Sequence, residues 1–157
     1  MTTMNYRKFP LVLLILTFCL STNSLAKDNN ERQLEQSLST IEEFKNSNST
    51  LSFAQGKKVM AAYKRLSELQ PDNFTYKKEY IYVLYTFPSQ VGGNQEHAEQ
   101  LLQKLALTLP FESHVLRFYL LVQTNQLDRA RAELEIIEEF SDRADEITPL
   151  YELLENS

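Results

Sequence analysis

One spacing recurs three times along this 157-residue chain and constrains its fold more than any other feature. In residues 94–110, Ala98 is followed by a large apolar residue four positions later, another three later, and a proline five beyond that. The same intervals recur upstream in residues 59–71 and downstream in residues 130–142. Side chains at these intervals share one face of a helix, which the last residue of the pattern ends. Three copies predict an array of packed helix pairs, a solenoid, which typically binds other molecules.

Apolar residues three or four apart predict six helices and a shorter C-terminal one. The six cover residues 32–45, 53–70, 74–87, 95–109, 112–124 and 127–140. Ser52 and Gln55 match a capping box at the start of the second helix. Thr148 and Pro149 match an N-cap and a first helical residue, so we expect a short helix from there that covers the end of the stack.

The N-terminus resembles an export signal. Two basic residues precede an apolar run at residues 11–20, and small residues lie three and one positions before a possible cut after Ala26. We therefore expect a signal peptide at residues 1–26 and one helical domain at residues 27–157. Ten residues are too few for a spanning helix, which needs about 20. No stable membrane span is expected after cleavage.

Two alternatives would keep the chain at the membrane. One is an uncleaved signal that acts as an anchor, and the other is a lipid attached at Cys19. The residue before it is Phe18, where lipoprotein signals have Gly, Ala or Ser, so we favour export, most simply to a periplasm. Cys19 is the only cysteine, and the exported domain would contain no disulfide, thiol nucleophile or cysteine zinc site.

Charge excludes some partners. The full chain has a formal net charge of -5, from 16 basic and 21 acidic residues. Removal of residues 1–26 removes two basic residues and no acids, which leaves 14 against 21, or -7. Nucleic acids are poor partners for such a surface, because phosphate binding depends on clustered Lys and Arg. No basic amphipathic helix is present to lie on a membrane.

Catalytic patterns are absent from the sequence. His97 and His114 belong to no H-E-x-x-H zinc motif, and no G-x-S-x-G nucleophile motif occurs. The acids of residues 133–146 alternate with apolar residues, which is typical of the solvated face of a helix. We expect no enzyme, no cofactor and no metal. The alternative is a helical enzyme that uses two facing carboxylates, one of them buried with a raised pKa.

Three short motifs resemble the tetratricopeptide repeat (TPR) family. These are P-D-N at residues 71–73, Ala98 with Leu102, and Q-L-D-R-A at residues 126–130. The resemblance covers about residues 52–142. Within the family, the chain is similar to small exported bacterial TPR proteins, including the periplasmic component associated with TRAP transporters. It implies an all-α fold, a short solenoid of about six helices plus a C-terminal capping helix. Tryptophan is absent, and the copies lie 39 and 32 residues apart against the usual 34, so we expect an irregular solenoid.

In this family, ligands lie along the concave surface made by the first helix of each pair. The family register implies six candidate partner-binding residues: Lys78, Tyr82, Tyr85, His114, Arg117 and Leu121. Tyrosines and cations suit an extended peptide or a carboxylate, since tyrosine offers contact area and arginine a bidentate fork. The competing interpretation is structural, with the tyrosines in the core and the cations as ordinary solvated charges.

These observations predict an exported, non-enzymatic protein-binding module or assembly factor. It would dock a peptide or a partner protein of the cell envelope on its helical groove. The alternative binding function is a periplasmic component for a small anionic solute or its transporter. That function requires a closed pocket between the helices of Tyr82 and His114. Homo-oligomers are compatible with the apolar, tyrosine-rich helix at residues 74–87.

Overall fold

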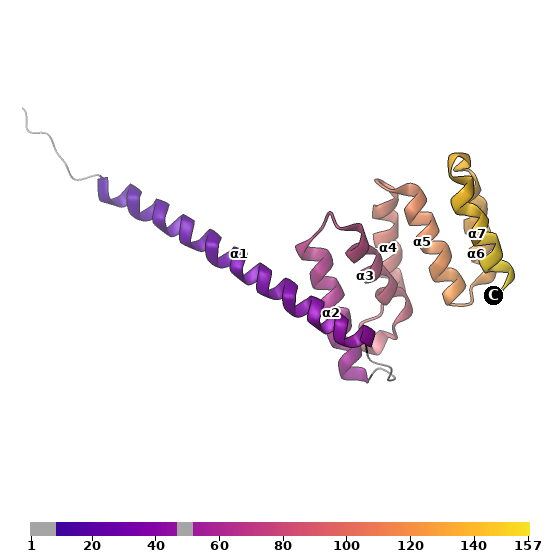
Figure 1. Ribbon diagram of the computed structural model, residues 1–157, viewed down its shortest axis with the longest axis horizontal. Coiled ribbons are helices and arrows are strands. Elements are labelled where there is room, and N and C mark those ends of the chain that lie inside the picture. Colours follow the sequence, from indigo (N-terminus) through magenta and orange to yellow (C-terminus); the bar gives the residue numbers. More distant parts are fainter. Residues whose placement is uncertain (1–8, 47–51) are drawn as a thin grey trace, which may run out of the picture.

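The computed structural model describes residues 9–46 and 52–157, with side chains from residue 28 onward except that of Ser141. Within these ranges the chain forms seven α-helices, two short 3₁₀ turns and no strand. The predicted all-α fold class of stacked helices is thereby confirmed. Figure 1 shows the helices α2 to α7 following one another in a row. Among the described residues, no helix combines the length and hydropathy needed to cross a membrane.

The bounds of the elements, in chain order, are α1 Phe9–Asn46, α2 Phe53–Leu69, α3 Phe74–Thr86, η1 Ser89–Val91, α4 Gln95–Ala106, α5 Pro110–Gln123, α6 Leu127–Glu138, η2 Ser141–Arg143 and α7 Ala144–Glu155. Each α-helix packs against the next one in the chain, and α3 also contacts α5. The C-terminal part of α1, where Ile41 is buried, packs on α2, whereas its N-terminal part projects away from the other helices (Figure 1).

Side-chain caps determine where three helices begin. The predicted capping box is present, because the Gln55 amide donates to Ser52 Oγ at 3.3 Å and the Ser52 amide donates to Gln55 Oε1 at 2.9 Å. Asn73 accepts a hydrogen bond from the Tyr76 amide, and Asn94 accepts one from the His97 amide. Each cap satisfies one of the amide groups that a helix start leaves without an internal partner.

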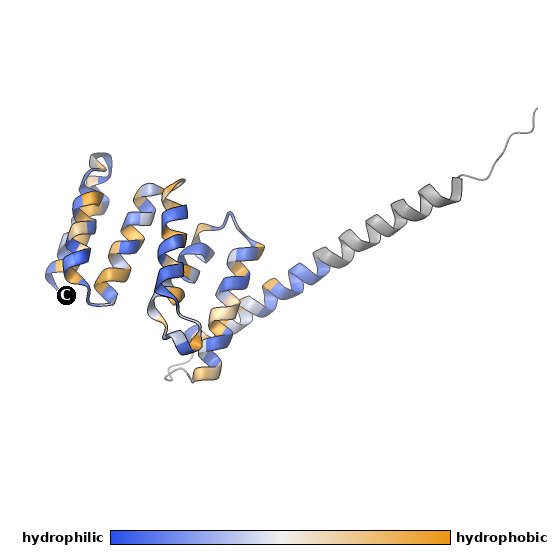
Figure 2. Cartoon of the chain, turned by 180° about the vertical axis from the view of Figure 1, so that it is seen from behind, coloured by the Kyte–Doolittle hydropathy of each residue, from blue (hydrophilic) through white to orange (hydrophobic). Residues whose placement is uncertain are grey.

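The recurring residues of the sequence pattern form the core. All nine are at most 6% exposed: Val59, Tyr63 and Leu66 of α2, Ala98, Leu102 and Leu105 of α4, and Ala130, Leu134 and Ile137 of α6. Figure 2 shows hydrophobic and hydrophilic residues alternating along these helices. The pattern therefore marks the face by which α2, α4 and α6 pack on their neighbours.

Two helix starts differ from the prediction. The first helix does not begin at Arg32, since α1 runs from Phe9 through the polar residues 28–31, and the expected cleavage point after Ala26 lies within it. The last helix begins at Ala144, so Thr148 is not its N-cap and Pro149 lies inside it. Burial of Ile147, at 6% exposure, favours this longer helix over the start that proline alone indicates.

Candidate functional site

Helices α3 and α5 and the start of α7 form an open groove of about 220 Å³, here called the α3–α5–α7 groove. Its floor is apolar and aromatic. The side chains that form this floor are Phe74, Phe111, Val115, Leu116 and Tyr119. Phe111 and Leu116 are buried, whereas Tyr119 is 42% exposed. The groove therefore offers an aromatic surface that no helix of the described chain covers.

Charged residues rim this groove. Arg143 donates hydrogen bonds to Glu112 Oε1 at 3.3 Å and to Glu146 Oε2 at 2.9 Å. Its guanidinium lies 4.0 Å from the centroid of the Phe111 ring, a cation–π geometry. Hydrogen bonding to Arg143 lowers the pKa of Glu146 below its ordinary value, so this carboxylate is ionised at neutral pH. These contacts attach the start of α7 to α5.

Lys78 is the remaining cation of the groove. Its side chain is exposed, and among the described residues no carboxylate lies within 4 Å of its ammonium group. At one end the rim has Arg143 between two carboxylates, which together have a net charge of -1. On α3 it has the unpaired positive charge of Lys78. Of the six residues expected to bind a partner, Lys78 is the one that lines this groove.

Tyr85 and Leu121 do not face a groove. Tyr85 is 2% exposed and Leu121 is 1% exposed, so both belong to the core and the expectation for these two residues is wrong. The Tyr85 hydroxyl accepts a hydrogen bond from Gln126 at 3.3 Å. Tyr82 is half-buried and donates from its hydroxyl to Gln123 Oε1 at 3.1 Å. Tyr82 and Tyr85 therefore join α3 to α5 and to the turn that follows α5.

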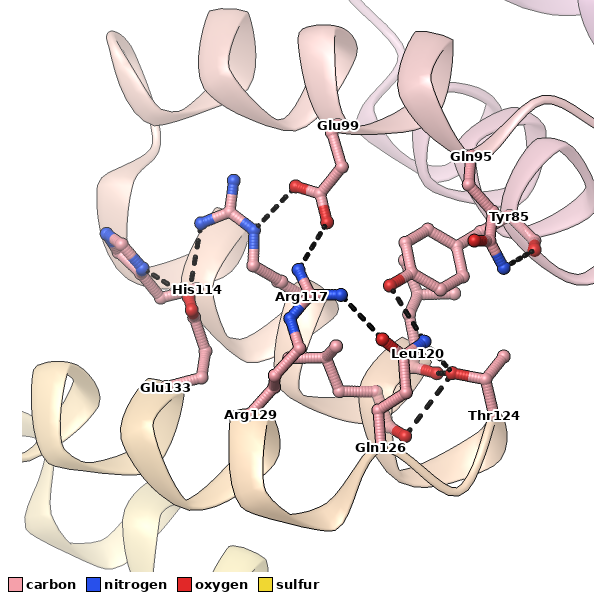
Figure 3. A network of polar contacts seen from close by, with 11 residues as sticks. Tyr85, Gln95, Glu99, His114, Arg117, Leu120, Thr124, Gln126, Arg129 and Glu133 are labelled. Atoms are coloured by element: carbon pink, nitrogen blue, oxygen red, sulfur yellow. Dashed lines mark hydrogen bonds and ion pairs between the residues drawn. The ribbon is translucent and has the colours of Figure 1, made fainter.

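His114 and Arg117 lie in a network of ion pairs between α4, α5 and α6 (Figure 3). Glu133 Oε1 is 2.5 Å from His114 Nδ1 and accepts a hydrogen bond from Arg117 Nη1 at 3.3 Å. Arg117 Nε also donates to Glu99 Oε2 at 3.0 Å. Glu133 is only 7% exposed, so its assignment to the solvated face of its helix is wrong. A buried carboxylate is tolerated here because it is paired and hydrogen-bonded.

The second oxygen of Glu99 completes this network. Glu99 Oε1 is buried and accepts no hydrogen bond, although Arg129 Nη2 lies 3.5 Å from it as an ion pair. Arg129 in turn donates to Gln126 Oε1 at 2.5 Å. The network joins three consecutive helices, and its charged groups point toward one another in Figure 3. It fixes the relative positions of α4, α5 and α6.

On α5, the residues expected to bind a partner and the residues that line the groove lie on different faces of the helix. The expected residues 114, 117 and 121 are spaced three or four apart and share one face of α5. The groove residues of α5 are 111, 112, 115, 116 and 119, which share another face. They differ by about two positions, and two residues rotate a helix by about 200°. The family register therefore selected the face of α5 that packs on α4 and α6. The signal that was missed is Tyr119, an aromatic residue on the opposite face.

No group of three or more His, Cys, Asp or Glu residues converges as a metal site among the residues that the structure describes. No protein-family model, curated protein or solved structure is significantly similar to this chain.

Proposed function

We propose that this protein is a non-enzymatic, exported TPR-like module that docks a peptide or partner protein in the α3–α5–α7 groove. The observation that supports this function best is the open aromatic floor beside the free cation of Lys78. A solenoid with an uncovered apolar groove is suited to binding an extended or helical segment. The basic, apolar and small-residue pattern of residues 1–26 supports a partner in the cell envelope.

The size of the groove favours part of a polypeptide over a whole solute. Small-molecule sites typically have volumes of about 300–1,000 Å³, whereas this groove has about 220 Å³. Such a space accepts one or two side chains of a longer partner. The floor suits an aromatic or aliphatic side chain, and Lys78 suits an acidic residue next to it. We therefore propose a partner segment that carries an apolar anchor flanked by Asp or Glu.

The test is selection of a random peptide library on the full chain. We expect enriched peptides that combine an apolar residue with an acid. Tyr119→Ala should weaken their binding about tenfold or more, because truncation of a central aromatic contact typically costs this much. Tyr151→Ala is the matched control, since Tyr151 of α7 is 43% exposed and outside the groove. Equal weakening by both variants, or no enriched motif, would contradict the proposed function.

A further inference from the structure

A larger hollow lies between α2, α3 and α4 and shares no residue with the α3–α5–α7 groove. Its volume is about 430 Å³, within the range typical of small-molecule sites. Most of its surface is apolar, and three of its walls come from three successive helices. We call it the lysine-rimmed hollow, after Lys64, Lys77 and Lys104.

The floor of the hollow consists of apolar and aromatic side chains. Ile81 and Leu105 are buried, and Leu101 is half-buried beside them. Tyr80 is 9% exposed, and its ring meets that of His97 edge-to-face, with 6.3 Å between centroids. Among the described residues, neither the Tyr80 hydroxyl nor the His97 ring has a hydrogen-bond partner. Two polar groups are thus available at the edge of an apolar floor.

The rim of the hollow is positive on a negative protein. The acidic residue that lines the hollow is Glu68. Its Oε1 lies 3.8 Å from Lys64 Nζ in a solvent-exposed ion pair. Within the part of the chain that the structure describes, Lys77 and Lys104 have no carboxylate within 4 Å of their ammonium groups. The hollow therefore has a net excess of two positive charges, although the whole chain has a formal net charge of -5. An anion is attracted to this rim and repelled by most of the remaining surface.

We propose that the lysine-rimmed hollow binds a small organic anion that has one carboxylate on an apolar body. The carboxylate would lie at the rim, where Lys77 and Lys104 provide charge-assisted hydrogen bonds. The apolar body would cover Ile81, Leu101 and Leu105 and remove them from water. Inorganic phosphate would use the charge and leave this floor exposed, so it is the poorer ligand. The proposal does not depend on peptide binding in the groove.

Isothermal titration of the full chain with decanoate tests this proposal. We expect saturable binding that weakens as salt is added, because the ammonium groups on the rim are exposed to solvent. Decyltrimethylammonium has the same alkyl chain with the opposite charge and should not bind. Inorganic phosphate should bind much more weakly than decanoate. Equal binding of the two alkyl ligands, or no binding of decanoate, would overturn the proposal.

Two adjacent lysines provide a matched pair of variants. Lys77 lies in the hollow and Lys78 in the groove, so Lys77→Glu and Lys78→Glu make the same charge change on different faces of α3. Lys77→Glu should weaken decanoate about tenfold or more, while Lys78→Glu leaves it nearly unchanged. Binding of the selected peptides should be weakened by Lys78→Glu and left nearly unchanged by Lys77→Glu. Equal loss of decanoate in both variants would overturn the site.

A filling variant separates binding from folding. Ser67→Phe places a large side chain in the hollow and should abolish decanoate binding while the circular dichroism spectrum keeps its helical form. Persistence of decanoate binding in a folded Ser67→Phe protein would also overturn the site. The peptide assay reports on the α3–α5–α7 groove and not on the hollow. If decanoate does not bind, the proposed function of the groove is still tested separately by Tyr119→Ala and Lys78→Glu.

Discussion

Glu133 illustrates, at the scale of single residues, how a charge becomes buried through its partners. It lies in a run of acids that alternates with apolar residues, and the local pattern alone indicates a solvated position. Its burial depends on His114 and Arg117, which precede it by 19 and 16 residues on the facing helix. The sequence pattern of α6 contains no information about that helix. This is why the network was not predicted, although His114 and Arg117 were singled out.

We predict that Glu133→Ala lowers the free energy of unfolding by about 3 kcal/mol, because it leaves His114 and Arg117 part-buried without their shared carboxylate. Glu133→Gln should cost less, since it keeps the shape and one acceptor oxygen. Urea unfolding followed by circular dichroism measures both changes. Glu135→Ala, an exposed acid on the same helix, is the control and should change stability little. Equal losses for Glu133→Ala and Glu135→Ala would contradict a structural role for the network.

We predict that the folded protein loses stability at alkaline pH because of Tyr63. Burial, aided by the nearby charge of Glu79, raises the pKa of its hydroxyl to about 12 from 10.0. Between these values the unfolded chain loses this proton and the folded chain keeps it. Stability is therefore intact below pH 10 and falls as the pH rises toward 12, by up to about 2 to 3 kcal/mol.

The measurement is urea unfolding of the wild type and of Tyr63→Phe at several pH values from neutral to alkaline. Tyr63→Phe lacks this proton, so its stability should fall less steeply above pH 10. The difference between the two curves isolates Tyr63 from the other tyrosines and lysines, which titrate in both proteins. Parallel curves would show that Tyr63 ionises equally in both states.

At the scale of elements, the loop between α3 and α4 shows what glycine does in this fold. The Gly92-Gly93 pair follows the 3₁₀ turn η1 and leads into α4. Gly92 has φ 109°, which favours glycine. Gly93 is required for a different reason, which is lack of space: a Cβ there would lie 1.8 Å from the carbonyl oxygen of Phe87. The Asn94 amide then donates to the Leu84 carbonyl at 2.7 Å, which closes the loop on α3.

We expect Gly93→Ala to lower the free energy of unfolding by more than about 2 kcal/mol, because backbone must move to admit the methyl group. Gly56→Ala is the comparison within the same structure. There a Cβ would lie 3.1 Å from Val91 Cγ1, which a side-chain shift relieves, and alanine improves helix propensity by about 1 kcal/mol. Thermal unfolding should show a large loss for Gly93→Ala and a small change for Gly56→Ala. Similar changes in both would refute this account of the loop.

The order and type of the helices of the whole molecule were predictable, because the recurring apolar face lies within single helices. Helix starts set by a side-chain cap, as at Ser52, were also predictable. The face of α5 that lines the groove was not predictable. Residues 114 and 116 both fit the helical periodicity, and only packing against the other helices decides which of them lies in the groove. The lysine-rimmed hollow was not predicted either: Lys64, Lys77 and Lys104 come from three helices and share no local pattern.

Stacking of each helix on its neighbours in the chain also determines how quickly the native state is reached. Most tertiary contacts join segments close in sequence, so only short loops must close before those contacts form and the entropy lost is small. Such a contact order is typical of folding in microseconds to milliseconds. The terminal helix α7 packs on one side only, so it is expected to open and close more often than the centre. Because α7 supplies Glu146 and begins directly after Arg143, the groove would lose one of its walls at each such opening.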